Sequence, residues 1–226
     1  SNGNRIIEMA KERGITVVVD NTFATPYLWH PLDHNADVVV HSATKYLGGH
    51  GNLTAGVLSG NDSDIRKEAM LYRKYVGSIL GSEDAYRLGT QVETFNLRYA
   101  QQCENAYRLA QVFENHRAIT RVRYPGLKSH DTHPEAAKMF GDRGFGAMLN
   151  IELKGGRTAT DAFVEAVADV ISYVPTLGDP TTIMLHAATV WGEERFPYPG
   201  MLRISVGFEP YEELETGVVT ALDTLV

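Results

Sequence analysis

Two short apolar runs near the start of the chain define the first predicted elements. Residues 15–19 read ITVVV and residues 38–40 read VVV, and continuous runs of β-branched residues are typical of strands buried in a parallel sheet. Residues 4–13 carry apolar side chains at helical spacing and are followed by Gly14, which favours a helix that ends there. Helix and strand therefore alternate, and the chain is predicted to be an α/β protein.

The next segments extend this pattern through the middle of the chain. A short strand at residues 53–59 is expected to continue the sheet, and an amphipathic helix is expected at about 64–75. A long helical pattern then runs from Ser82 to about Asn115, in which Gly89 is expected to mark a bend or a close contact. This helix is expected to link a larger domain to a smaller one.

Beyond the long helix the pattern is α+β. Strands are predicted near residues 119–123, 147–153, 181–185 and 201–206, and helices near 132–140, 158–169 and 210–224. We place the domain boundary near Phe95, so that residues 1–95 form one domain and residues 96–226 the other.

Polar side chains lie directly after the second apolar run. The stretch from Asp37 to Gly51 reads DVVVHSATKYLGGHG, which sets Ser42, Thr44 and Lys45 in a glycine-rich turn after the strand. Ligands of open parallel sheets bind at the carboxyl ends of strands. Hydroxyls can donate to a phosphate while an amine forms a Schiff base with an aldehyde, so these groups suit a phosphorylated carbonyl cofactor. Taken alone, Lys45 is better explained as an ordinary solvated loop lysine.

The first apolar run also ends in a chemical group. Asp20 follows ITVVV directly, and a carboxylate at the end of an apolar strand is costly to bury without a cationic partner. The protonated ring nitrogen of pyridoxal phosphate is such a partner, and a carboxylate there would keep the ring an electron sink. Asp20, Ser42, Thr44 and Lys45 together therefore favour a cofactor site over a chance loop.

Several longer stretches resemble the Cys/Met-metabolism family of pyridoxal-phosphate enzymes, which includes cystathionine γ-synthase, cystathionine γ-lyase, methionine γ-lyase and O-acetylhomoserine sulfhydrylase. These stretches are VVVDNTFATPYL, HSATKYLGGHGN, GSILGSEDAYRL, the NLR at 96–98, YPGL at 124–127, TLGD at 176–179 and LRISVGFEP at 202–210. The resemblance covers nearly the whole chain, and its Ser-Ala-Thr-Lys motif is highly specific in this context.

The resemblance implies a fold-type I pyridoxal-phosphate enzyme: residues 1–95 as the remaining part of a mostly parallel-sheet cofactor-binding domain and 96–226 as an α+β C-terminal domain. It implies that Lys45 carries the cofactor and acts as a base, with Asp20 on the ring nitrogen and Ser42 and Thr44 on the phosphate. Arg203 would bind the substrate carboxylate, and Thr176 would line the same pocket. From its place in a strand alone, Arg203 would equally pair with an internal carboxylate.

The implied reaction is γ-elimination or γ-replacement on a sulfur amino acid or a homoserine ester. Alternatives are a β-cleaving cystathionine lyase, another fold-type I enzyme such as an aminotransferase, and a non-catalytic scaffold fragment. Residues 187–191 read AATVW where the family usually has a sequence close to Pro-Ala-Ser and then Thr-His, which leaves the exact substrate open. The resemblance also implies a missing N-terminal portion that completes the site, and a homo-oligomer built as a dimer of dimers. His186 is expected to be a packed histidine.

Composition narrows the possible classes of function further. The 226 residues carry a net charge of −7, which argues against a nucleic-acid surface. A single cysteine, Cys103, excludes an internal disulfide and is expected to be a small packed residue. His30 and His34 lack further ligands at zinc-like spacing, so no metal is predicted. No apolar run reaches the length of a membrane span and no signal-like segment is present, so we expect a cytoplasmic enzyme with a small amino-acid substrate.

Overall fold

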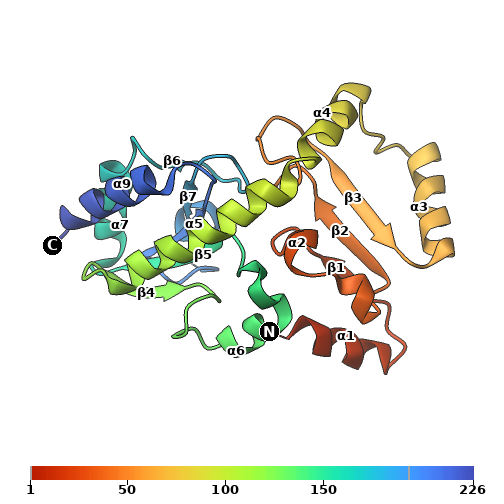
Figure 1. Ribbon diagram of the computed structural model, residues 1–226, viewed down its shortest axis with the longest axis horizontal. Helices are drawn as coiled ribbons and strands as arrows, with labels where there is room; N and C mark the ends of the chain where they lie inside the picture. The colour runs from red at the N-terminus through yellow and green to blue at the C-terminus, as the bar shows by residue number, and fades with distance from the viewer. Residues whose placement is uncertain (1, 193) are drawn as a thin grey trace.

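The computed structural model of the protein describes residues 2–192 and 194–226. Its elements form two groups, and a long helix, α5 (Phe95–Asn115), runs from the middle of the molecule along the second group (Figure 1). The first group contains α1 (Gly3–Lys11), β1 (Val18–Asp20), α2 (Thr25–Leu28), a 3-10 turn η1 (Pro31–His34), β2 (Val38–Ser42), β3 (Gly56–Gly60), α3 (Ser63–Tyr75) and α4 (Ser82–Val92). The fold is α/β, as predicted.

The second group follows α5. It contains β4 (Ile119–Arg123), α6 (His133–Phe140), a 3-10 turn η2 (Gly141–Arg143), β5 (Met148–Leu153), α7 (Gly156–Ala166), β6 (Ser172–Tyr173), β7 (Ile183–His186), α8 (Ala187–Trp191), β8 (Met201–Ser205) and α9 (Tyr211–Asp223). The α+β pattern predicted beyond the long helix is present. Only β6 and α8 were not predicted.

The first sheet has the order β1-β2-β3, with β1 parallel and β3 antiparallel to β2. Among the described residues the predicted mostly parallel sheet is thus one parallel and one antiparallel pair. The first strand begins at Val18 rather than Ile15, because the amide of Val17 donates to the side-chain carboxylate of Asp37 at 2.7 Å instead of to a neighbouring strand. Lys11 fixes that carboxylate with an ion pair of 2.8 Å and helps to hold its pKa below its usual range.

The long helix predicted from Ser82 is two helices. The break falls at Thr94, whose φ of −97° and ψ of 2° are not helical. Gly89 lies inside α4, and a Cβ atom there would meet nothing within 4 Å, so the predicted bend or contact at this glycine was wrong. The guanidinium of Arg98 explains the break, since it donates to the carbonyl of Gln91 at 2.9 Å and to the hydroxyl of Thr94 at 3.0 Å.

The second sheet has the order β4-β5-β8-β7-β6, antiparallel except for the β6–β7 pair. Helices α5, α7 and α9 pack with it and with one another around a large apolar core. In that core Leu149, Ile151 and Ile204 are fully buried. The strict alternation of β5, in which every second side chain is buried, is the pattern expected of a strand with one face on the core.

A second apolar cluster joins the two groups. It brings Tyr46 from the turn after β2 against Tyr99 and Cys103 of α5 and Leu177 of the second group. Cys103 is only 4% exposed, as expected of a packed residue, and burial raises the pKa of its thiol to about 12. The domain boundary near Phe95 stays a prediction: α5 begins at that residue, yet this cluster runs across it.

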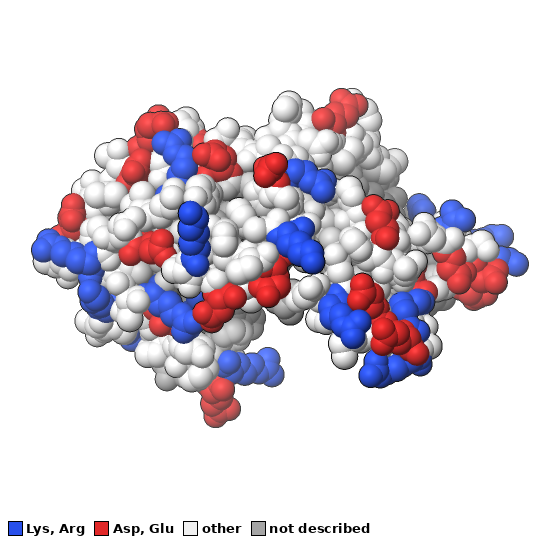
Figure 2. All heavy atoms as spheres, turned by 60° about the horizontal axis from the view of Figure 1, so that its bottom comes forward, with Lys and Arg blue, Asp and Glu red and all other residues white. Residues whose placement is uncertain are grey.

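The surface carries both signs of charge. Acidic and basic side chains are interspersed on the face seen in Figure 2, which fits the moderate net charge of −7. Among residues 2–192 and 194–226, the helices are all too short or too polar to cross a membrane.

Candidate functional site

Lys45 lies in a tight turn directly after β2. The amide of Lys45 donates to the carbonyl of Ser42 at 3.1 Å, and the amide of Gly49 donates to the carbonyl of Lys45 at 2.6 Å. The side chain is partly buried and leaves the first sheet toward the second group. Its Nζ donates to Oγ1 of Thr176, 131 positions further along the chain, at 2.8 Å.

Thr176 also contacts Arg203 and so joins the two cationic side chains. Arg203 lies at the centre of β8, between Asn150 of β5 and Leu185 of β7. Its Nη2 donates to the main-chain carbonyl of Thr176 at 2.6 Å, and burial lowers the pKa of its guanidinium. Lys45, Thr176 and Arg203, three of the residues singled out in the sequence, therefore form one connected group.

The loop that carries Thr176 rests on the backbone of the lysine turn. Gly178 has a φ of +85°, and a Cβ atom at this position would lie 2.7 Å from the amide nitrogen of Tyr46. The amide of Gly178 donates to Oγ of Ser205 at 2.9 Å, which ties the loop to the end of β8. Only glycine allows both this φ and this approach, so Gly178 sets the distance between Thr176 and Lys45.

Asp20 and Ser42 are joined through Thr22. The hydroxyl of Thr22 donates to Oδ1 of Asp20 at 2.6 Å and accepts the amide proton of Ser42 at 2.8 Å. The two strand ends of β1 and β2 are thus locked side by side, as their order in the sequence predicted. The carboxylate of Asp20 is exposed rather than buried, which corrects the premise that it lies inside an apolar environment; β1 pairs only with β2 in the part of the chain that is described.

The hydroxyl of Thr44 is hydrogen bonded to Ala55 rather than to Lys45, Thr176 or Arg203. It donates to the carbonyl of Ala55 at 3.3 Å and accepts the amide proton of Ala55 at 3.0 Å. The hydroxyl proton is therefore used within the chain, and the remaining lone pair can only accept. Ser42 is partly buried, and within residues 2–192 and 194–226 its hydroxyl makes no hydrogen bond, so of the two it is the freer donor.

Two residues of this region were missed in the sequence. Arg98 is 7% exposed and donates from Nη1 to the carbonyl of Tyr46 at 3.1 Å and from Nη2 to that of Leu47 at 3.2 Å. A Cβ atom on Gly49 would lie 1.7 Å from this guanidinium. Arg98 thus holds the lysine turn through its main-chain carbonyls. In the sequence it appeared only within the NLR stretch at 96–98, with no role assigned to it.

Asp179 is the second missed residue. It follows Gly178 directly and is partly buried, and burial raises the pKa of its carboxyl while the charge of Lys45 acts in the opposite direction. Its main-chain carbonyl accepts from Nε2 of Gln102 at 3.1 Å. The same loop therefore sets a hydroxyl and a carboxylate near one amine.

His186 and the segment after it form a compact unit beside Arg203. His186 is 2% exposed, and its ring nitrogens contact Oγ1 of Thr189 at 2.6 Å and the carbonyl of Pro199 at 2.8 Å. The expectation of a packed histidine is confirmed. The unusual AATVW sequence forms α8, and its last residue, Trp191, places its ring 5.5 Å from the guanidinium carbon of Arg203.

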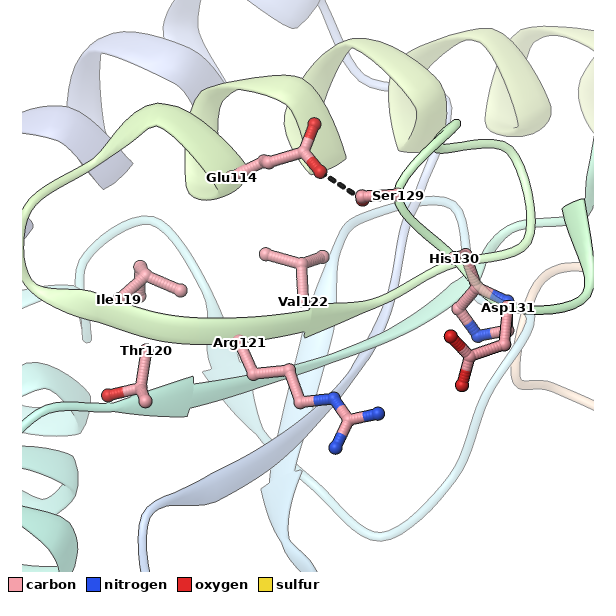
Figure 3. Close-up of a pocket in the computed structure, with 8 residues that line it drawn as sticks. All are labelled: Glu114, Ile119, Thr120, Arg121, Val122, Ser129, His130 and Asp131. Atoms are coloured by element: carbon pink, nitrogen blue, oxygen red, sulfur yellow. Dashed lines mark hydrogen bonds between the residues drawn. The ribbon is translucent and has the colours of Figure 1, made fainter.

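A separate hollow of about 230 Å³ lies along β4 at the edge of the second sheet. In Figure 3, Glu114 and Ser129 are hydrogen bonded to each other on the side opposite the strand, and Arg121 extends from the strand. Both signs of charge line it, and it contains none of the residues singled out in the sequence.

Comparison with known proteins gives the same family as the sequence motifs. Residues 3–223 match the family model described as "Cys/Met metabolism PLP-dependent enzyme". The chain is 36% identical to a cystathionine beta-lyase of Lactococcus lactis subsp. cremoris, covering 96% of this chain and 58% of the relative. It is 37% identical to an L-methionine gamma-lyase of Pseudomonas putida, covering 96% of this chain and 56% of the relative.

A solved structure agrees. A cystathionine gamma synthase from Xanthomonas oryzae pv. oryzae, in complex with aminoacrylate and cysteine, superposes with a TM-score of 0.94 at 32% identity, covering all of this chain and 59% of that one. The predicted fold-type I architecture is confirmed. The chain thus spans less than two thirds of the length of these relatives. On its motifs, its fold and the match over residues 3–223, the chain belongs to the Cys/Met-metabolism family of pyridoxal-phosphate-dependent enzymes.

Proposed function

We propose that the chain takes part in pyridoxal-phosphate-dependent γ-elimination or γ-replacement on a sulfur amino acid or a homoserine ester. The observation that carries this proposal is the convergence of an amine and a guanidinium on Thr176, at 2.8 Å and 2.6 Å. An amino-acid substrate has one carboxylate next to one reactive carbon, so a base and a carboxylate receptor must lie close together.

The donors near Lys45 suit the family's cofactor. A phosphate needs hydroxyl or amide donors, and Ser42 has a free hydroxyl; a protonated ring nitrogen needs an anion, and Asp20 offers a carboxylate whose Oδ1 is already oriented by Thr22. Thr44, with its proton donated to Ala55, would contribute less to the phosphate than Ser42. When bound, pyridoxal phosphate supplies an aldehyde and an electron-withdrawing ring.

The chain's own groups account for the remaining steps. Lys45 would carry the cofactor and, once freed by the substrate, take the proton from the substrate's α-carbon as a base. Thr176 is a hydrogen-bond acceptor that orients Nζ. Arg203 would bind the α-carboxylate along the edge of its guanidinium plane, which matches a carboxylate in two parallel hydrogen bonds.

A β-cleaving lyase is the second candidate, because one of the relatives named above is a cystathionine beta-lyase. The two reactions differ in product. With cystathionine as substrate, γ-cleavage releases 2-oxobutyrate and β-cleavage releases pyruvate, and each also releases ammonia. Product analysis by chromatography separates them, and an aminotransferase would release no ammonia.

The role of Lys45 is tested by borohydride reduction of the chain mixed with pyridoxal phosphate, followed by peptide mass mapping. We expect the covalent adduct on the peptide that contains Lys45. Lys45→Ala should lose the adduct and at least about a thousandfold in turnover, since it removes both the attachment point and the base, while its circular dichroism spectrum stays unchanged. Lys74→Ala, a lysine of the exposed helix α3, is the matched control. An adduct on Lys74, or full activity of Lys45→Ala, would remove Lys45 from the chemistry.

We also propose that the protein is a homo-oligomer, a dimer of dimers, in the cytoplasm. The support for assembly is helix α3, which has no buried residue, together with Tyr75 and Val76 at its end, which are 74% and 65% exposed. Apolar and aromatic surface of this kind is typical of an interface. Sedimentation velocity should give a mass that is a multiple of the 25.0 kDa chain, and a monomer at micromolar concentration would contradict the proposal.

A further inference from the structure

Trp191 has an unusual place beside the proposed carboxylate receptor. Its ring centroid lies 5.5 Å from the guanidinium carbon of Arg203, within the range of a cation–π contact. The indole also packs against Phe196, with ring centroids 5.4 Å apart. The side chain is 39% exposed, so part of it remains open to a ligand.

The position of Trp191 is fixed by buried residues. It is the last residue of α8, which follows β7 without a loop. His186, at the junction, anchors both Thr189 and the carbonyl of Pro199, and Ala187 and Ala188 of the helix are buried. The backbone that carries the indole is therefore held by packed residues, and the ring itself contacts Phe196 and Arg203.

Arg203 needs such a contact to present a defined edge. One of its donors, on Nη2, is used by the carbonyl of Thr176 at 2.6 Å, and its Nε is buried without a hydrogen-bond partner in the described part of the chain. A carboxylate binds in the plane of a guanidinium, whereas an aromatic ring contacts the face. The guanidinium carbon lies 5.5 Å from the centroid of the Trp191 ring, and a contact on the face of the guanidinium would leave its in-plane N–H groups for a carboxylate.

We propose that Trp191 is a positioning residue for carboxylate recognition, and that its indole fixes the guanidinium plane of Arg203 and forms one wall of the carboxylate site. The inference rests on the proposed role of Arg203. The ligand class is the α-carboxylate of a small amino acid. A ring at this position contributes through its π face, so an aliphatic side chain of similar bulk cannot replace it.

The experiment compares Trp191→Phe with Trp191→Leu, since the first keeps a π face and the second keeps only apolar bulk. Glycine is the probe and methylamine, which lacks the carboxylate, is its control; calorimetry on the chain loaded with pyridoxal phosphate measures both affinities. We expect Trp191→Leu to bind glycine about three- to fivefold more weakly and Trp191→Phe to stay within about twofold of the native chain. Methylamine affinity should be the same in all three, and circular dichroism checks that each variant is folded.

Fluorescence gives a second readout that does not depend on the stability of a Trp191 variant. The chain has two tryptophans, and the other, Trp29, donates from its indole nitrogen to Asn4 in the first group. In Trp29→Phe the emission therefore reports Trp191 alone. We expect glycine, and not methylamine, to change this emission, because the carboxylate would bind against the ring.

Arg203→Met separates the two proposals. If Arg203→Met fails to bind glycine and the native chain binds it, Arg203 keeps its role. The inference about Trp191 is nevertheless wrong if Trp191→Leu binds glycine as tightly as Trp191→Phe and glycine leaves the emission of Trp29→Phe unchanged. If Arg203→Met binds glycine as well as the native chain, the carboxylate role of Arg203 is wrong and the inference is overturned with it. Both proposals are supported only if Arg203→Met loses glycine binding and Trp191→Leu binds glycine more weakly than Trp191→Phe.

Discussion

The two sheets of this protein differ in how far they are covered by their own chain. In the second sheet, Leu149, Ile151 and Ile204 are fully buried by helices α5, α7 and α9. In the first, Val18 of β1 is 60% exposed and Leu58 of β3 is 46% exposed. Helices α3 and α4 beside it contain no buried residue.

This difference shows where the lysine turn obtains its rigidity. Lys45 leaves the less covered sheet, yet its turn is held by Arg98 of α5 and contacted by Gly178 of the second group. The site is therefore organised by the well-packed part of the molecule, while no apolar side chain of α3 and α4 is fully buried in this chain, as the proposed assembly requires. Stability and site geometry should both depend more on the second group than on the first.

The largest effect is expected from a cavity in the second sheet. Leu149→Ala removes a fully buried side chain from the core and should lower the free energy of unfolding by about 2–5 kcal/mol. Met70→Ala on α3 removes a side chain that is 60% exposed and should cost less than about 0.5 kcal/mol in the isolated chain. Urea titration followed by circular dichroism measures both.

A cost for Met70→Ala close to that of Leu149→Ala would contradict the difference in burial between the two sheets. It would mean that α3 is buried against another molecule in solution. An unfolding midpoint that depends on protein concentration would then identify that molecule as a second copy of the chain.

The sequence predicted the strands of the second sheet closely because their pattern is local. The alternation of side chains along β5 can be recognised from that segment alone. Two of the differences in the first half arise from side-chain contacts with the main chain: Asp37 accepts from the amide of Val17, 20 positions earlier, and Arg98 donates to the carbonyl of Gln91, 7 positions earlier. Elements as short as β6 and α8 span too few residues for a period to be recognised.

For the site, the sequence supplied the residues but not their contacts. Lys45 and Thr176 are 131 positions apart, and only the tertiary fold joins them. Residue type could not reveal that the Thr44 hydroxyl is bonded to Ala55, nor that Asp20 is exposed on an edge strand. Trp191 was named in the sequence only as the last residue of the AATVW segment that departs from the family pattern, and nothing local predicted its contact with Arg203.

An intermediate effect is expected from the contact that joins the two groups at Lys45. Gly178→Ala places a Cβ atom 2.7 Å from the amide nitrogen of Tyr46 and also strains a φ of +85°. Gly192→Ala is the matched control, since its φ is +88° but a Cβ atom there would meet nothing within 4 Å. The control should cost about 1 kcal/mol in urea titration and Gly178→Ala about 1–2 kcal/mol more.

Gly178→Ala should also lower the yield of the borohydride-trapped adduct on Lys45, because the loop that carries Thr176 must move away from the lysine turn. Equal unfolding free energies and equal adduct yields for the two alanine variants would show that the loop and the lysine turn are not coupled, which contradicts the view that the second group organises the site.

The smallest effect at neutral pH is expected from Tyr46, which belongs to the first group but is buried by the second. Its hydroxyl is buried near Ser205 without a hydrogen bond of good geometry, within the described residues. Removing such a group leaves no partner unsatisfied, so Tyr46→Phe should stay within about 0.5 kcal/mol of the native chain at pH 7. Tyr86→Phe, at a side chain that is 76% exposed, controls for the loss of one phenol.

Alkaline pH should separate Tyr46→Phe from the native chain. Burial raises the pKa of Tyr46 above its ordinary value, so above about pH 10 the unfolded chain releases this proton while the folded chain retains it. Retention of the proton by the folded chain makes the unfolding free energy fall as pH rises, by up to about 1.4 kcal/mol per pH unit for one group. Tyr46→Phe lacks this loss and should become the more stable of the two chains above pH 10 in urea titrations. If the unfolding free energies of the two chains fall equally with pH, Tyr46 is not buried by the second group.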